Sequence, residues 1–228
     1  MIEPEYLDKL NCADQLTTIA YFHDRMSDNV VKVDTFNALL EHNDEYIYFR
    51  TDHHWTGKGA WYTSRYFLDA VGRDYPPLEA YKTFTYESFL GSLYRHTQNE
   101  NLKNNPDTLV AYQSPTVSEL LTASKGVYTT HPLIHKEITS SNKYLCFCAG
   151  DHEYYEVHNE TIKDGSSILI IKESYGNAFL PVIADSYEYV YVYVFRSILT
   201  KKVDAYYTMV TVIIYNLYMF NQFMYILI

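Results

Sequence analysis

Apolar residues recur along the chain in two patterns, one typical of helices and the other typical of strands. Helical spacing appears over residues 15–26, 35–41 and 56–71. Thr56 is a suitable N-cap for the third of these helices, and Gly72 is a suitable end for it. Short apolar runs bounded by polar residues predict strands at residues 29–34, 45–50, 143–151, 166–174, 188–196 and 210–216.

The predicted strands alternate with helical stretches, which is typical of an α/β sheet. Several of them end in polar residues. In such sheets the ligand lies beyond the carboxyl ends of the strands. We therefore expect a functional site where these ends meet, and the residues at the ends are Gly150, Asp151, His152, Ser174, Arg196 and Asn216.

Length and patterning predict a single domain over residues 1–228, since 228 residues suffice for one sizeable core. Residues 83–143 are polar, irregular and rich in Asn, Ser and Thr. We expect short hairpins and loops there, forming an insertion or a lid over the rest of the domain.

The two ends of the chain bear on the question of a membrane. The start of the chain has neither the basic residues nor the apolar stretch of a signal peptide. Residues 205–228 carry no charge and are long enough to span a bilayer. Because Asn216, Asn221 and Gln222 interrupt this stretch, we predict a strand and a short terminal helix rather than a membrane span.

Composition excludes some partners and leaves others open. The net charge of −10 argues against binding nucleic acid or an anionic membrane surface, because Lys and Arg clusters hold both. The 25 tyrosines fit either a sugar-binding surface or a coding bias toward AT-rich codons. The three cysteines are Cys12, Cys146 and Cys148, and the last two, at strand spacing, are expected to be buried thiols rather than a disulfide.

Ser174 stands where a predicted strand meets a predicted helix. Gly176 permits a sharp turn there, and Asn177 opens the helix. A serine in that position is exposed at the edge of the sheet, and the N–H groups of the helix start suit a developing oxyanion. Two interpretations are open, a nucleophile or a plain helix N-cap. The segment lacks the G-x-S-x-G motif of α/β-hydrolases.

A nucleophilic serine needs a base, and the base needs an orienting acceptor. The segment "YFRTDHHWTGKGAW", residues 48–61, supplies both in Asp52 and His54. On an extended turn the carboxylate can accept the Nδ1–H of the imidazole and fix its tautomer. Trp55 would then form an aromatic wall, and His53 is expected to point away from the site. The alternative is that a histidine merely caps the next helix or packs under Trp55.

Metal binding is a rival use of the same motif. Asp52 and His54 could bind zinc with a further ligand chosen from His131, His135, His152 and Asp151. His131 and His135 are four residues apart, but the proline between them argues against a shared helix. The chain has no H-E-x-x-H and no C-x-x-C motif.

The segment around Asp52 closely resembles the signature of the DHHW family of bacterial proteins. The resemblance runs from about Val30 to Asn216. The family is related to the SGNH-like domain of the alginate O-acetyltransferases, whose D-x-H-W motif precedes the serine block, a circularly permuted order relative to ordinary SGNH hydrolases. Later blocks of this sequence match the family in the same order, at residues 89–94 (FLGSLY), 148–157 (CAGDHEYYEV), 170–179 (IIKESYGNAF) and 210–216 (VTVIIYN).

This resemblance implies an SGNH-like (flavodoxin-like) three-layer α/β sandwich with a mostly parallel sheet. The chain departs from the family at Glu173, where members usually have Asp, and at Asp151, where they usually have Asn. Most members also carry an N-terminal membrane anchor and a leading α/β segment, and neither is found in this sequence.

Carried over by position, the resemblance makes Asp52 the acid, His54 the base and Ser174 the nucleophile of a catalytic triad. Arg196 and Asn216, at the ends of the next two strands, become oxyanion or substrate-binding candidates. Asn177, on the helix start, is a weaker candidate for the same role.

The implied function is that of a serine esterase or O-acetyltransferase acting on a cell-surface polysaccharide. Its substrates would be an acyl donor and a polysaccharide or other glycan acceptor, with envelope polysaccharide-assembly proteins as candidate partners and no cofactor. The family implies an extracytoplasmic or membrane-anchored location on the outer face. Two other classes stay open: a metal-dependent hydrolase using the Asp-His-His cluster, and a non-catalytic truncated remnant.

Overall fold

The computed structural model describes residues 15–194 and 211–212. No helix within these residues is long and apolar enough to cross a membrane. The helices are α2 (Gln15–His23), α3 (Thr35–Leu40), α4 (Gly57–Ala70), η1 (Leu78–Ala80), α5 (Ser92–Thr97), α6 (Glu100–Lys103), η2 (Lys143–Cys146) and α7 (Gly176–Ile183). The strands are β1 (Lys82–Phe89), β2 (Asp107–Gln113), β3 (Glu119–Ser124), β4 (Val127–Pro132), β5 (Tyr154–His158), β6 (Ser167–Lys172), β7 (Tyr189–Val194) and β8 (Thr211–Val212).

Six strands form the main sheet in the order β4-β3-β5-β7-β6-β8. Only β6 pairs in parallel, with β7 on one side and β8 on the other. The pairs β4–β3, β3–β5 and β5–β7 are antiparallel. The α/β class is therefore confirmed, but the expected mostly parallel sheet is wrong. Crossover helices impose parallel pairing only around β6, where α7 links it to β7.

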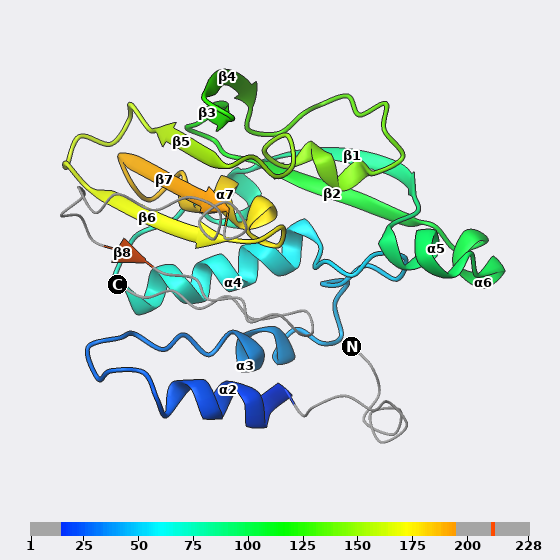
Figure 1. Ribbon diagram of the computed structural model, residues 1–228, viewed down its shortest axis with the longest axis horizontal. Coiled ribbons are helices and arrows are strands. Elements are labelled where there is room, and N and C mark those ends of the chain that lie inside the picture. Colours follow the sequence, from blue (N-terminus) through cyan, green and yellow to red (C-terminus); the bar gives the residue numbers. More distant parts are fainter. Residues whose placement is uncertain (1–14, 195–210, 213–228) are drawn as a thin grey trace.

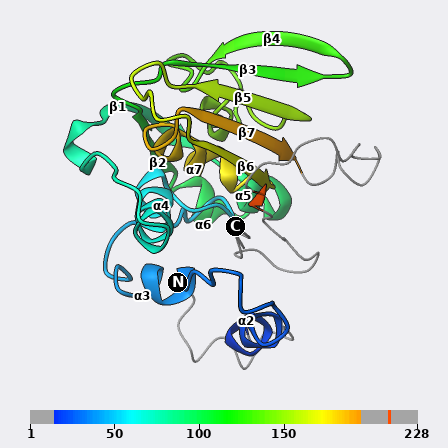
Figure 2. The same cartoon turned by 90° about the vertical axis from the view of Figure 1, so that its left-hand side faces the viewer.

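The segment 83–143 holds much of the antiparallel structure. Strands β1 and β2 form a separate two-stranded sheet, and β3 and β4 form a hairpin that extends the edge of the main sheet. Figure 1 shows β1 and β2 beside the main sheet, with α5 and α6 connecting them at one end, and Figure 2 shows the β3–β4 hairpin at the outer edge of the main sheet. Whether this segment acts as an insertion or a lid stays a prediction.

The core lies between the main sheet and the helices α4 and α7. Strands β6 and β7 alternate buried and half-buried residues, so one face of each carries apolar side chains such as Ile170 and Val192 into the core. Helix α4 runs along the sheet in Figure 1 and packs on α7, where the rings of Phe67 and Phe179 lie 5.9 Å apart. Both rings are fully buried.

Three predicted strands do not form. Residues 29–34 have no regular structure, and within 45–50 only Tyr48 makes a bridge, to Trp55. Residues 143–151 begin as the short helix η2, and three successive residues from Cys148 then adopt positive φ, which ends any extended run. Strand β5 lies just beyond this turn. The strands expected at 166–174 and 188–196 are present as β6 and β7.

Candidate active site

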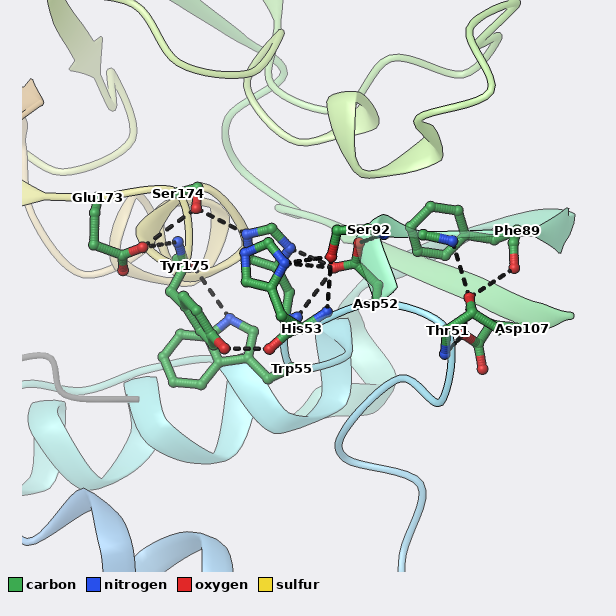
Figure 3. Close-up of polar contacts among 12 residues, drawn as sticks. Thr51, Asp52, His53, Trp55, Phe89, Ser92, Asp107, Glu173, Ser174 and Tyr175 are labelled. Atoms are coloured by element: carbon green, nitrogen blue, oxygen red, sulfur yellow. Dashed lines mark hydrogen bonds and ion pairs between the residues drawn. The ribbon is translucent and has the colours of Figure 1, made fainter. Parts of the chain in front are cut away.

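The loop that carries the D-H-H-W motif is anchored by a carboxylate at the start of β2. Asp107, which is 1% exposed, accepts hydrogen bonds from the Thr51 amide at 2.8 Å and the Thr51 hydroxyl at 2.6 Å. It also accepts from the amide of Arg50 at 3.1 Å. After the motif, Thr56 caps α4 as expected, accepting from the Gly59 amide at 3.2 Å. Both ends of the short loop are therefore fixed, and Figure 3 shows the first of these anchors, at Thr51 and Asp107.

Asp52 uses both of its oxygens within this loop. Oδ1 lies 2.5 Å from His54 Nδ1 and accepts from the His54 amide at 3.0 Å. Oδ2 accepts from the amide of Ser92, the first residue of α5, at 2.7 Å. Burial raises the pKa of Asp52, but the hydrogen bonds and the charge of His54 outweigh it and hold this pKa well below its ordinary value. Asp52 is thus an ionised acceptor that sets the orientation of the His54 ring.

Ser174 completes a chain of three side chains. It follows β6 directly and precedes α7, and its Oγ lies 2.8 Å from His54 Nε2. The His54 imidazole therefore lies between the serine and the carboxylate, with Nε2 toward Ser174 and Nδ1 toward Asp52. Because Asp52 accepts the Nδ1 proton, Nε2 carries the lone pair that faces the Ser174 hydroxyl. Asp52, His54 and Ser174, which sequence analysis named together, are brought together in this structure.

Three neighbours shape the surroundings of the serine. Glu173 Oε2 lies 3.2 Å from Ser174 Oγ and accepts from the Tyr175 amide at 3.0 Å. Burial raises the pKa of Glu173 above its ordinary value. Trp55, 3% exposed, donates its indole N–H to the Tyr175 carbonyl at 3.1 Å. Trp55 therefore ties the motif loop to the start of α7, behind the serine.

The side chain of Asn177 forms its hydrogen bond in a second polar cluster, with Asp151 and Lys172, and not with the serine. Its side-chain amide donates to Asp151 Oδ1 at 2.9 Å, and the same oxygen lies 3.4 Å from the Nζ of Lys172. Lys172 is 1% exposed, and burial lowers its pKa. Arg196 and Asn216, the other two oxyanion candidates, lie outside the described residues.

The expectation that His53 points away from the site is wrong. Its ring lies 3.8 Å from that of His54, and its Nδ1 lies 2.5 Å from Ser92 Oγ. The Tyr175 hydroxyl donates to the His53 carbonyl. The adjacent histidines therefore face the same way because the loop turns tightly between its two anchors.

Asp52, His53 and His54 form the one group among the described residues whose three ligand atoms lie close enough for a metal ion. The separation of 2.5 Å between Asp52 Oδ1 and His54 Nδ1 corresponds to a direct hydrogen bond. The other histidines named for a metal site gather elsewhere in the fold, with the His131 ring 5.8 Å from His135 and 5.3 Å from His152. The donor set thus fits a hydrogen-bonded relay better than a metal centre.

Gly91 gives the motif loop the room that it needs. A methyl group at this position would overlap the side chain of Asp52. The backbone of Gly91 has φ −83° and ψ −159°, which other residues adopt. Glycine is therefore needed here because a side chain would not fit, and not because of its backbone conformation. This explains the Gly91-Ser92 pair in the block FLGSLY, where the Ser92 amide also holds Asp52 Oδ2.

We expect Gly91→Ala to lower the free energy of unfolding by about 1–3 kcal/mol, because the new methyl must displace Asp52 from its buried hydrogen bonds. Urea unfolding measures this change. Leu93→Ala is the control, because this neighbouring side chain is 41% exposed and its truncation should change stability by less than about 0.5 kcal/mol. A stability equal to that of the wild type for Gly91→Ala would contradict the packing argument.

Comparison with known proteins places this site in a family. A profile of the DHHW protein family matches residues 4–193, most of the chain. The chain belongs to the DHHW family. The crystal structure of a DHHW family protein from Eubacterium siraeum is similar to this DHHW protein with a TM-score of 0.73 and 32% sequence identity. The match covers 84% of this chain and 64% of the E. siraeum chain, so this DHHW protein spans just under two thirds of that relative's length.

More distant structures share the fold. Bacillus cereus PatB1 with a sulfonyl adduct has a TM-score of 0.71 at 17% identity, covering 87% of this chain and 71% of PatB1. A second PatB1 structure has a TM-score of 0.68 at 18% identity, covering 87% and 73%. Identities this low show a common fold and nothing finer. No curated protein sequence gives a match.

Proposed function

We propose that this DHHW protein is a serine-dependent esterase or O-acyltransferase whose triad is Ser174, His54 and Asp52. The observation that carries the proposal is the unbroken contact from Asp52 Oδ1 to His54 Nδ1, and from His54 Nε2 to Ser174 Oγ, at 2.5 and 2.8 Å. A nucleophile, a base and an orienting carboxylate at these distances are the general requirement for activating a serine hydroxyl.

The chemistry follows from the proton positions. His54 Nε2 takes the hydroxyl proton while Ser174 Oγ forms a bond to the carbonyl carbon of an ester. The imidazolium then gives this proton to the leaving alcohol as its C–O bond breaks, which leaves an acyl-serine. A sugar hydroxyl or water next loses its proton to His54 and attacks the acyl group, and Ser174 recovers the proton as it leaves. Asp52 stays ionised throughout and stabilises the imidazolium.

The candidate oxyanion donors are backbone amides at the start of α7 and two side chains outside the described residues. The backbone N–H groups at the start of α7 follow the serine directly in the chain. Without substrate, the Tyr175 amide donates to Glu173 Oε2, and the Gly176 and Asn177 amides donate to the carbonyls of Glu173 and Ser174. Arg196 and Asn216 remain candidates. A well-placed oxyanion donor contributes about 10²–10³ in rate.

The proposed substrate class follows from the family resemblance. We propose an acetyl group as the acyl group and a cell-surface polysaccharide or other glycan as its acceptor. The corresponding location is the outer face of the cell envelope, with polysaccharide-assembly proteins as candidate partners. The aromatic wall predicted for Trp55 would support the serine indirectly, through the carbonyl of Tyr175.

The test is covalent labelling of the folded protein with a fluorophosphonate, followed by proteolysis and mass mapping. We expect one adduct, on Ser174, formed at the same rate with and without a chelator such as EDTA. A sulfonyl fluoride should label the same residue, and PatB1, which shares the fold, carries a sulfonyl adduct in one of its structures. Ester hydrolysis that EDTA abolishes, or a folded sample without a Ser174 adduct, would contradict the proposal and favour the metal-dependent or non-catalytic alternatives.

A further inference from the structure

Three aromatic rings contact the imidazole of His54. Tyr175 lies 4.9 Å from it and is tilted by 54°, whereas Tyr144 and His53 cover its faces. On one side the Tyr144 ring lies 3.9 Å from it, centroid to centroid, and within 10° of parallel. On the other side the His53 ring lies 3.8 Å away at 36°. His54 makes its two hydrogen bonds in its own ring plane, to Asp52 and Ser174. The rings cover its faces, and the hydrogen bonds leave from its edges.

Tyr144 is held rigidly by the core. It belongs to η2, is 4% exposed, and packs edge-on against Phe49 and Phe147 at 6.4 and 5.1 Å. Its hydroxyl is buried without a hydrogen-bond partner among the described residues. An unpaired buried hydroxyl lowers the stability of the fold. The contribution of Tyr144 to the site therefore comes from its ring and not from its hydroxyl.

His53 is fixed by different means. Its Nδ1 is bound to Ser92 Oγ, and its carbonyl accepts from the Tyr175 hydroxyl. Burial, followed by the charge of His54, lowers the pKa of His53 to about 4. His53 is therefore a neutral ring near pH 7, and it adds no positive charge beside His54 when His54 is protonated.

We propose that Tyr144 and His53 are positioning residues that act through His54, holding its ring in the plane shared by Asp52 and Ser174 and stabilising its protonated form. Their role in catalysis rests on the proposed serine-dependent function. Clamping prevents the ring from rotating about χ2, so one orientation satisfies both hydrogen bonds. The electron-rich faces, above all that of Tyr144, attract the imidazolium that forms during acyl transfer.

Matched variants separate the ring from other properties of these side chains. Tyr144→Phe keeps the ring and removes only the unpaired hydroxyl, whereas Tyr144→Leu removes the ring. We expect Tyr144→Phe to be labelled on Ser174 by the fluorophosphonate as fast as the wild type. Tyr144→Leu should be labelled about tenfold more slowly. His53→Phe and His53→Ala form a second pair at a site 31% exposed, where truncation is tolerated more readily than in the core.

Nitrogen-15 NMR of His54 gives a readout that needs no turnover. In the wild type and in both Phe variants we expect the single tautomer with the proton on Nδ1. In Tyr144→Leu and His53→Ala we expect averaged shifts from a mixture of tautomers and ring orientations. Equal labelling rates and equal His54 shifts in folded Phe and truncated variants would overturn the inference. If the wild type forms no Ser174 adduct but the His54 shifts of the variants change as expected, Tyr144 and His53 do position the His54 ring and the proposed serine-dependent function is wrong.

Discussion

Alanine in place of either Ser174 or His54 is expected to lower the turnover of a simple ester such as p-nitrophenyl acetate by about 10⁶-fold. Each variant removes one end of the 2.8 Å contact that activates the hydroxyl. The double variant should lose no more than either single variant, because the two groups act as a unit and the remaining one has nothing to act with. Steady-state kinetics on the three variants measures this non-additivity.

A buried serine outside the site provides the control. Ser186 is 4% exposed, and its hydroxyl has no hydrogen-bond partner among the described residues. Ser186→Ala should therefore leave turnover at the wild-type level. Losses that multiply in the Ser174→Ala, His54→Ala double variant would mean that the two residues act independently. Such a result would contradict a shared proton transfer.

The parts of the site that follow from local geometry were predictable from sequence. Asp52 and His54 are two residues apart, so their contact needs only an extended turn and no knowledge of the fold. Ser174 was predictable because a buried apolar strand, a polar end and Gly176 together place a side chain at a strand–helix junction. Their convergence across 120 residues came from the family resemblance and not from periodicity.

Strand direction was not predictable in the same way. The alternation along 166–174 and 188–196 gave correct strands, but alternation is the same for parallel and antiparallel neighbours. The antiparallel half of the sheet comes from β3, β4 and β5, which lie in polar or turn-rich sequence. Their pairing depends on distant contacts such as those between β5 and β7.

The residues that sequence analysis missed contribute through features that many residue types share. Ser92 binds Asp52 with its backbone amide, which every residue but proline has. Tyr144 acts through a ring in a chain with 25 tyrosines. Asp107 is one of many acids in the sequence, and nothing in its neighbours marks it as the anchor of a loop 56 residues away. Gly91 and Ser92 do lie within the matched block FLGSLY, and this block is the sequence signal that could have identified them.

Asp52→Asn is expected to slow acylation of Ser174 by about 10⁴-fold while leaving the fold intact. The two oxygens of Asp52 accept from opposite sides, Oδ1 from His54 and Oδ2 from the Ser92 amide. Asparagine has one acceptor oxygen and one donor group. If its oxygen faces Ser92, its NH₂ group faces His54 Nδ1 and forces the ring proton onto Nε2, which can then no longer accept the serine proton.

The opposite orientation of the new side-chain amide in Asp52→Asn sets its NH₂ group against the Ser92 amide, so a donor faces a donor. Either arrangement loses a charge-assisted hydrogen bond, and we expect the free energy of unfolding to fall by about 1.5–3 kcal/mol at pH 7. The loss should shrink as the pH falls below the ordinary pKa of an aspartate. There the unfolded chain takes up a proton at Asp52 while the native carboxylate, whose pKa folding depresses, stays ionised, so the stabilisation that Asp52 contributes decreases. Rapid-mixing kinetics of acylation and urea unfolding at pH 7 and pH 3 measure the two effects. An Asp52→Asn variant acylated within tenfold of the wild-type rate would mean that Asp52 holds the loop and does not set the His54 tautomer.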